Sequence, residues 1–236
     1  MLIKHTEKWV AATLLLFCVC AVLLHMGSAA VRAANLAADV PVLVVDAGHG
    51  GFDGGAVSAS GVSEQDINLA VAQRVCALAA FFGVRTAETR PDENALDYDP
   101  ARRVRDNKVA DIRAREAFVQ QFADPVFLSI HLNKFEDPQY HGAQVFYSPN
   151  HAGSRTLAEL LQASLIRGCD PANHREAKQA DRSIYLMKTL TCPAVIAECG
   201  FLSNPEEERR LADPGYQKQL AAAITHGYLQ YISARA

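Results

Sequence analysis

The chain has 236 residues, of which 50% are hydrophobic, and a formal net charge of −3. This length suits one compact domain with a sizeable core, and no shift of composition divides the chain after its first 38 residues. Nucleic acid is excluded as an expected partner, because proteins that bind it present clustered Lys and Arg, and this chain has no basic excess.

The first 38 residues have the pattern of an export signal. Two lysines precede an apolar run at 9–24, and small residues follow it. We expect 1–38 to be a signal peptide cleaved near Ala30 or Ala34, or else a retained membrane anchor, since the run approaches the roughly 20 residues that span a bilayer. The protein is therefore expected to be exported and to touch the membrane only through this segment, with 39–236 as its catalytic domain.

The remaining chain alternates between short apolar segments and longer segments with helical spacing. Several short segments are apolar at consecutive positions, which is typical of strands buried on both faces of a parallel sheet. The alternation predicts an α/β fold, a single domain with a mostly parallel twisted sheet and helices on both faces. The expected elements are strands at 42–46, 84–89, 126–130, 143–147 and 194–197, helices spanning 67–78, 109–122, 157–165 and 216–231, and a surface loop at 91–107.

Four cysteines follow the export segment, and none belongs to a C-x-x-C pair. This spacing excludes a zinc ribbon. We expect the thiols to pack as small buried hydrophobes, although an even number of cysteines in an exported chain leaves disulfides open. They are Cys76, Cys169, Cys192 and Cys199.

Three predicted strands are followed by a His or a Glu: His49, His131 and Glu198. The carboxyl ends of parallel strands lie at the same edge of a sheet, so these side chains should converge. Glu64 is expected to open the helix after the first strand, with Ser63 or Ser60 as its N-cap, and to face the same edge.

Two imidazoles and one carboxylate are a common ligand set for catalytic zinc, which keeps its fourth position open for water. We predict His49, Glu64 and His131 as zinc ligands and Glu198 as a catalytic base, because a carboxylate after an apolar run is costly to bury unless it meets a charge or a metal. Taken singly, a loop histidine or a glutamate at a helix start has an ordinary structural explanation. Their convergence favours the metal site.

The glycine cluster 48–55 invites a competing interpretation as a dinucleotide-binding turn. Asp53 stands where G-x-G-x-x-G requires its third glycine, and the expected helix begins about ten residues too late to face a phosphate. Small residues that let the backbone pass close to a metal centre explain the cluster better.

Four segments around these residues resemble the zinc-dependent N-acetylmuramoyl-L-alanine amidases of bacterial cell walls, and the resemblance extends from Val42 to Ile232. It implies Zn²⁺ at the three predicted ligands, a catalytic glutamate at Glu198, and hydrolysis of the amide between the lactyl group of N-acetylmuramic acid and L-alanine of peptidoglycan stem peptides. The segments are Val44-Val-Asp-Ala-Gly-His-Gly-Gly51, Gly61-Val-Ser-Glu-Gln-Asp-Ile-Asn-Leu69, Ser129-Ile-His-Leu-Asn133 and Ala197-Glu-Cys-Gly-Phe-Leu-Ser-Asn-Pro-Glu206.

Within this family the chain is similar to the short spore-cortex amidases of spore-forming bacteria, through its single domain and the stretches 141–147 and 183–188. That similarity implies a role in the spore cortex or in cell-wall remodelling, in the wall or the forespore intermembrane space, and leaves an accessory lipoprotein or activator open. The inhibitory helix of division amidases has no room after the strand at 143–147. Arg90 and Arg115 also resemble recurrent family positions, which the sequence leaves between substrate contacts and solvated surface.

Two other functions remain open on the residues alone. A zinc peptidase would cut stem-peptide bonds and release shortened peptides, whereas an amidase would leave an intact glycan and a free stem peptide. A wall-binding module without activity would not require a base beside the metal, so Glu198 argues against it.

Overall fold

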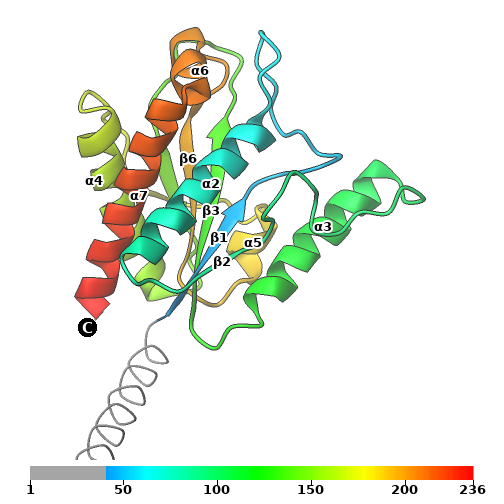
Figure 1. Cartoon of the computed structure of the whole chain (residues 1–236), viewed down its shortest axis with the longest axis horizontal. Helices are drawn as coiled ribbons and strands as arrows, with labels where there is room; N and C mark the ends of the chain where they lie inside the picture. The colour runs from blue at the N-terminus through cyan, green and yellow to red at the C-terminus, as the bar shows by residue number, and fades with distance from the viewer. Residues whose placement is uncertain (1–40, 236) are drawn as a thin grey trace, which may run out of the picture. The chain divides into compact units, whose positions relative to one another are not determined.

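A six-stranded sheet organises residues 41–235, the part of the chain that this computed structural model describes (Figure 1). The predicted export segment at 1–38 lies outside the described residues. The order of the strands in the sheet is β2-β1-β3-β6-β4-β5. Their bounds are Val42–Ala47 for β1, Thr86–Glu88 for β2, Pro125–Asn133 for β3, Gln144–Tyr147 for β4, Lys178–Gln179 for β5 and Ala194–Phe201 for β6.

The sheet is mostly parallel, as predicted. Strand β1 pairs in parallel with β2 and β3, and β3 pairs in parallel with β6. Strand β4 runs antiparallel to β6, and the short β5 runs parallel to β4. The carboxyl ends of β1, β3 and β6 therefore lie at one edge of the sheet. His49 follows β1, His131 lies in β3 and Glu198 lies in β6.

Helices cover both faces of the sheet and bury a separate hydrophobic cluster on each. The larger cluster joins the sheet to α2, α4 and α7, and the smaller one joins it to α3 and α5 (Figure 1). Among residues 41–235, no helix combines the length and apolar character needed to cross a membrane. The helices are α2 (Glu64–Phe81), α3 (Val104–Val119), α4 (Ala152–Cys169), α5 (Tyr185–Thr189), α6 (Pro205–Ala212) and α7 (Pro214–Arg235).

Strand alternation decides which side chains reach the site. In β1, Leu43 and Val45 belong to the larger cluster, whereas Val42 and Val44 belong to the smaller one. Because successive side chains of a strand point to opposite faces, Asp46 falls on the face that α3 and α5 cover. The same alternation places Phe127, Ser129 and His131 of β3, and Ile196 and Glu198 of β6, beside the cavity on that face.

The strands at the site are longer than predicted. Strand β3 continues to Asn133 and β6 continues to Phe201, so His131 and Glu198 lie within strands and not after them. The reason is that the two strands pair in register through His131 and Glu198, and only then meet an irregularity before Asn133. The sequence did not predict β5, α5 or α6, and the loop after Pro91 ends earlier than expected, at the start of α3.

Two smaller expectations have a definite outcome. Cys76, Cys169, Cys192 and Cys199 are all free, and the first, second and fourth are buried, as packing predicted. Ser63 occupies the N-cap position of α2, but its hydroxyl makes no capping hydrogen bond and donates to the carbonyl of Gly54 at 3.0 Å. Ser63 is therefore the N-cap residue, as predicted, although its side chain does not cap the helix.

Candidate metal centre

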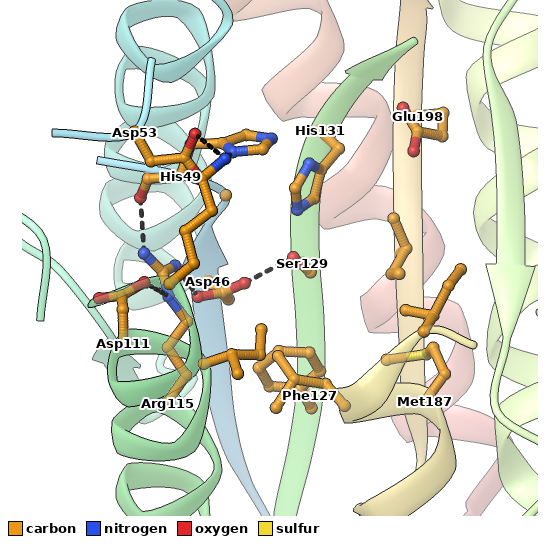
Figure 2. Close-up of a pocket in the computed structure, with 16 residues that line it drawn as sticks. Asp46, His49, Asp53, Asp111, Arg115, Phe127, Ser129, His131, Met187 and Glu198 are labelled. Carbon is orange, nitrogen blue, oxygen red and sulfur yellow. Dashed lines mark hydrogen bonds and ion pairs between the residues drawn. The ribbon is translucent and has the colours of Figure 1, made fainter. Parts of the chain in front are cut away.

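The structure brings His49, Glu64 and His131 together, with one ligand atom from each lying within 4.8 Å of the other two. Nε2 of His49 lies 3.3 Å from Oε2 of Glu64, and Nδ1 of His131 lies 3.0 Å from Oε1 of the same carboxylate. Figure 2 shows the two imidazoles side by side above the cavity, one from the turn after β1 and one from β3. Two nitrogens and a carboxylate at this spacing form a donor set of the kind that zinc prefers.

The glycine cluster makes this approach geometrically feasible. A Cβ atom on Gly48 would lie 2.3 Å from the His131 ring, and one on Gly55 would lie 2.6 Å from both Oε2 of Glu64 and the His49 ring. His49 itself has a φ of 64°, a left-handed conformation that costs a non-glycine residue energy. The turn is thus shaped around the imidazoles and the carboxylate, and no helix N-terminus follows it closely.

Glu64 opens α2, as predicted, and its carboxylate is held by the backbone. Oε2 accepts a hydrogen bond from the amide of Ala56 at 2.8 Å, and Oε1 accepts one from the amide of Leu132 at 3.0 Å. Burial acts to raise the pKa of Glu64, but its contacts with His131 and His49 outweigh burial and hold this pKa below its usual range. The group is therefore an ionised acceptor facing two imidazoles.

Asp53 is a site residue that the sequence analysis missed. Its Oδ2 lies 3.0 Å from Nδ1 of His49, on the side of the ring away from Glu64, and its Oδ1 accepts a hydrogen bond from Nζ of Lys108 at 2.9 Å. Burial acts to lower the pKa of His49, but its contacts with Asp53 and Glu64 raise this pKa to about 9. The signal available in the sequence was a carboxylate four residues after a histidine within one tight turn.

A buried ion pair lies beneath the imidazoles. Arg115 of α3 donates to Asp46 at 2.6 Å, and Asp46 also accepts hydrogen bonds from Thr89 and Ser129, each at 2.6 Å. Arg115 is 2% exposed and donates to the carbonyl of His49 as well. Burial acts to raise the pKa of Asp46, but Arg115 and the two hydroxyls hold it below its usual range.

Neither arginine singled out in the sequence is a solvated surface residue. Arg90 and Arg115 are each 2% exposed. Arg90 donates to the carbonyls of Ala47 and Gly48 at 2.9 and 3.2 Å, and Arg115 also donates to the Ala47 carbonyl, at 2.9 Å. Both guanidiniums therefore fix the backbone that leads into His49, a structural role that the sequence left open.

Glu198 stands opposite His131 in the register of β3 and β6. Its Oε2 atom is buried and has no hydrogen-bond partner among the described residues, and burial raises the pKa of this carboxyl group. An unpartnered buried carboxylate oxygen beside a His-Glu-His cluster fits a site that a metal and its water complete. The adjacent Cys199 belongs to the larger hydrophobic cluster on the other face of the strand, as expected.

The cavity in front of these residues has a volume of about 360 Å³ and two chemically different ends. His49, His131 and Glu198 line the polar end, at the carboxyl edge of the sheet (Figure 2). Phe127 and Met187 line the apolar end, between α3 and α5. The cavity therefore places two imidazoles and a carboxyl group next to an apolar wall.

Comparison with known proteins agrees with this chemistry. Residues 43–230 match the family model described as N-acetylmuramoyl-L-alanine amidase. The germination-specific N-acetylmuramoyl-L-alanine amidase of Bacillus subtilis is 34% identical over 194 residues, which cover 82% of this chain and 81% of the relative.

Solved structures show the same similarity. The CwlD amidase of Clostridioides difficile, determined in complex with the GerS lipoprotein, is 37% identical with a TM-score of 0.79, over 82% of this chain and 99% of that one. The amidase AmiC2 of Nostoc punctiforme is 27% identical with a TM-score of 0.70, over 82% and 97% of the two chains. The chain therefore belongs to the N-acetylmuramoyl-L-alanine amidase family, as its sequence predicted.

Proposed function

We propose that this chain is a zinc hydrolase that cleaves the amide between the lactyl group of N-acetylmuramic acid and L-alanine of peptidoglycan. In this proposal His49, Glu64 and His131 hold the zinc, and Glu198 is the catalytic acid–base. One observation supports it above the others: the three candidate ligands converge within 4.8 Å of one another, beside a buried glutamate whose Oε2 has no partner among the described residues.

Zinc held by His49, Glu64 and His131 would supply Lewis acidity, which activates water and polarises the scissile carbonyl. The proton transfers then fall to Glu198. Its Oε2 accepts the proton of the attacking water and delivers it to the departing nitrogen of L-alanine, as one group serving first as base and then as acid. Burial raises the pKa of Glu198, which suits a group that must both take up and release a proton near neutral pH.

We also propose where the enzyme works. Residues 39–236 form the catalytic domain and 1–38 export it, so hydrolysis takes place outside the cytoplasm, where peptidoglycan lies. The similarity to a germination-specific amidase supports a substrate in the spore cortex. The lipoprotein bound in the CwlD complex supports an accessory lipoprotein for this chain too.

The experiment that tests the activity is digestion of purified peptidoglycan, both vegetative and cortical, by the metal-free chain with and without added zinc. Mass spectrometry should detect stem peptides that begin with L-alanine only when zinc is present. Shortened peptides with the lactyl amide intact would favour a peptidase instead. Zinc-loaded protein that binds peptidoglycan without cutting it, even with its candidate lipoprotein present, would contradict the proposal.

A further inference from the structure

An ionic chain runs from α3 to the candidate ligand His49. Nζ of Lys108 donates to Oδ1 of Asp53 at 2.9 Å, and Oδ2 of Asp53 lies 3.0 Å from Nδ1 of His49. Figure 2 shows the Asp53 carboxylate next to the His49 ring, and Lys108 lines the same cavity. The opposite ring nitrogen, Nε2, is the one that faces Glu64.

Asp53 is held in place by hydrogen bonds that do not involve His49. Its backbone exchanges two hydrogen bonds with Gly50, at 2.9 and 3.0 Å, which close the turn after β1. Its side chain is only 21% exposed, whereas that of Lys108 is 52% exposed. A carboxylate fixed by its backbone and by a lysine is suited to orient an imidazole, since it accepts a hydrogen bond from Nδ1–H and leaves the Nε2 lone pair for a metal.

His49 needs such support because its backbone does not favour the position it occupies. The residue has a φ of 64° in a turn rich in glycine, a conformation that persists only when surrounding contacts hold it. Arg115 of α3 donates to its carbonyl, while Lys108, about two turns earlier in α3, holds the Asp53 carboxylate against its ring. One helix thus holds both the main chain and the side chain of this residue.

We propose that Asp53 is a positioning residue for zinc, which fixes the orientation of the His49 ring, and that Lys108 in turn fixes Asp53. The inference rests on the proposed function, since it requires His49 to be a ligand. Removal of carboxylates that hold metal-bound histidines typically weakens metal binding by about 10- to 100-fold. An exposed ion pair contributes less, so loss of Lys108 should weaken zinc binding by only about two- to fivefold.

The test uses the full chain as the parent and as four variants, Asp53→Ala, Asp53→Asn, Lys108→Met and Lys108→Arg, together with one control variant. Zinc affinity is measured by competition with a chromophoric chelator, and the visible spectrum of the Co²⁺-loaded protein reports the geometry around the metal. Thermal unfolding of each protein in excess chelator shows whether the metal-free fold survives. Lys178→Met serves as the control, because Lys178 lies in the exposed strand β5, away from the cavity.

We expect Asp53→Ala and Asp53→Asn to lose about 10- to 100-fold in zinc affinity and to change the Co²⁺ spectrum, with Lys108→Met intermediate and Lys108→Arg close to the parent. Parent-like affinity and spectrum in both Asp53 variants would overturn the inference while leaving zinc at the site. A parent that binds no zinc would overturn the proposed function itself, and with it the inference. If the Asp53 variants fail to fold, Lys108→Met decides: an affinity and a spectrum equal to those of the parent contradict the chain of contacts.

Discussion

His131 and Glu198 face each other across neighbouring parallel strands, paired in the register of β3 and β6. The pairing sets a candidate zinc ligand beside the candidate proton acceptor without any loop between them. Groups built on strands are held more rigidly than groups on loops, which suits a reaction that needs both at fixed positions. His49 is different, because it lies in a turn and depends on glycines and on α3 for its position.

Substitution of Gly48 should damage the candidate metal centre without removing any ligand. In Gly48→Ala the new methyl group would lie 2.3 Å from the His131 ring, so the ring or the turn must move. We expect a loss of about 1–3 kcal/mol in the free energy of unfolding and weaker zinc binding. Denaturant titration and chelator competition measure the two effects.

Gly54→Ala is the matched control from the same turn. A Cβ atom there meets only the Ser63 hydroxyl, at 3.4 Å, which is ordinary contact. We expect a change within about 0.5 kcal/mol and unchanged zinc binding. Equal effects of the two substitutions would show that close packing against His131 is not what requires glycine at position 48.

Zinc uptake should release a proton near neutral pH. In the metal-free chain, burial lowers the pKa of His49 but Asp53 and Glu64 raise it to about 9, so its imidazole is protonated at pH 7.5. A zinc ligand must be neutral, so binding displaces about one proton, and the apparent affinity should rise with pH until about pH 9. Calorimetric titrations at pH 7.5 in buffers of different ionisation enthalpy measure the release, and heats independent of the buffer would refute it.

The same pKa predicts how the metal-free chain responds to pH. The folded-state pKa of His49 lies above its ordinary value of 6.5, because the protonated ring interacts favourably with Asp53 and Glu64. The stability that these interactions add to the fold is complete below pH 6.5 and is lost as pH rises through about 9. Denaturant titrations of the chelated protein between pH 6 and pH 10 should therefore show a declining free energy of unfolding on the alkaline side. Asp53→Ala should flatten that decline, since it removes one of the contacts that raise this pKa.

Loss of Arg115 should destabilise the fold. Arg115→Met would leave Asp46 as a buried carboxylate with only the hydroxyls of Thr89 and Ser129, and would free the carbonyl of His49. Breaking a buried pair from one side typically costs about 3–5 kcal/mol. Arg155→Met, which removes an exposed pair with Glu159, is the control and should change the midpoint of unfolding little. A midpoint shift no larger for Arg115→Met than for the control would contradict a structural role for the buried pair.

The sequence was sufficient to predict a mostly parallel sheet and the convergence of His49, Glu64 and His131, because both follow from local pattern. Apolar runs of strand length mark β1, β3 and β6, and the polar residue after each run marks the edge where they converge. The position of Glu64 near the same edge follows because, in a βα unit, the helix begins close to the carboxyl end of the preceding strand. The family resemblance then agreed with what the residues had already indicated.

What the sequence could not supply was pairing between distant residues. In the sequence, Asp53 was only the residue that breaks a G-x-G-x-x-G motif. Its contact with the His49 ring, at 3.0 Å, is visible only in the structure. The sequence left Arg90 and Arg115 between substrate contacts and solvated surface, because burial of an arginine depends on partners such as Asp46 that lie tens of residues away. Helix α5 and strand β5 are too short to have a period of their own, so tertiary contacts alone define them.

The most direct test of the account compares the parent chain with Glu198→Gln, both loaded with zinc and mixed with peptidoglycan. Mass spectrometry of the released peptides and metal analysis of the proteins are made on the same samples. The account predicts that the parent releases intact stem peptides beginning with L-alanine, and that Glu198→Gln keeps its zinc but loses about 10²- to 10⁴-fold in rate. A variant that retains zinc and cleaves at the parental rate would contradict the assignment of Glu198, and parental products shortened within the stem peptide would contradict the amidase reaction.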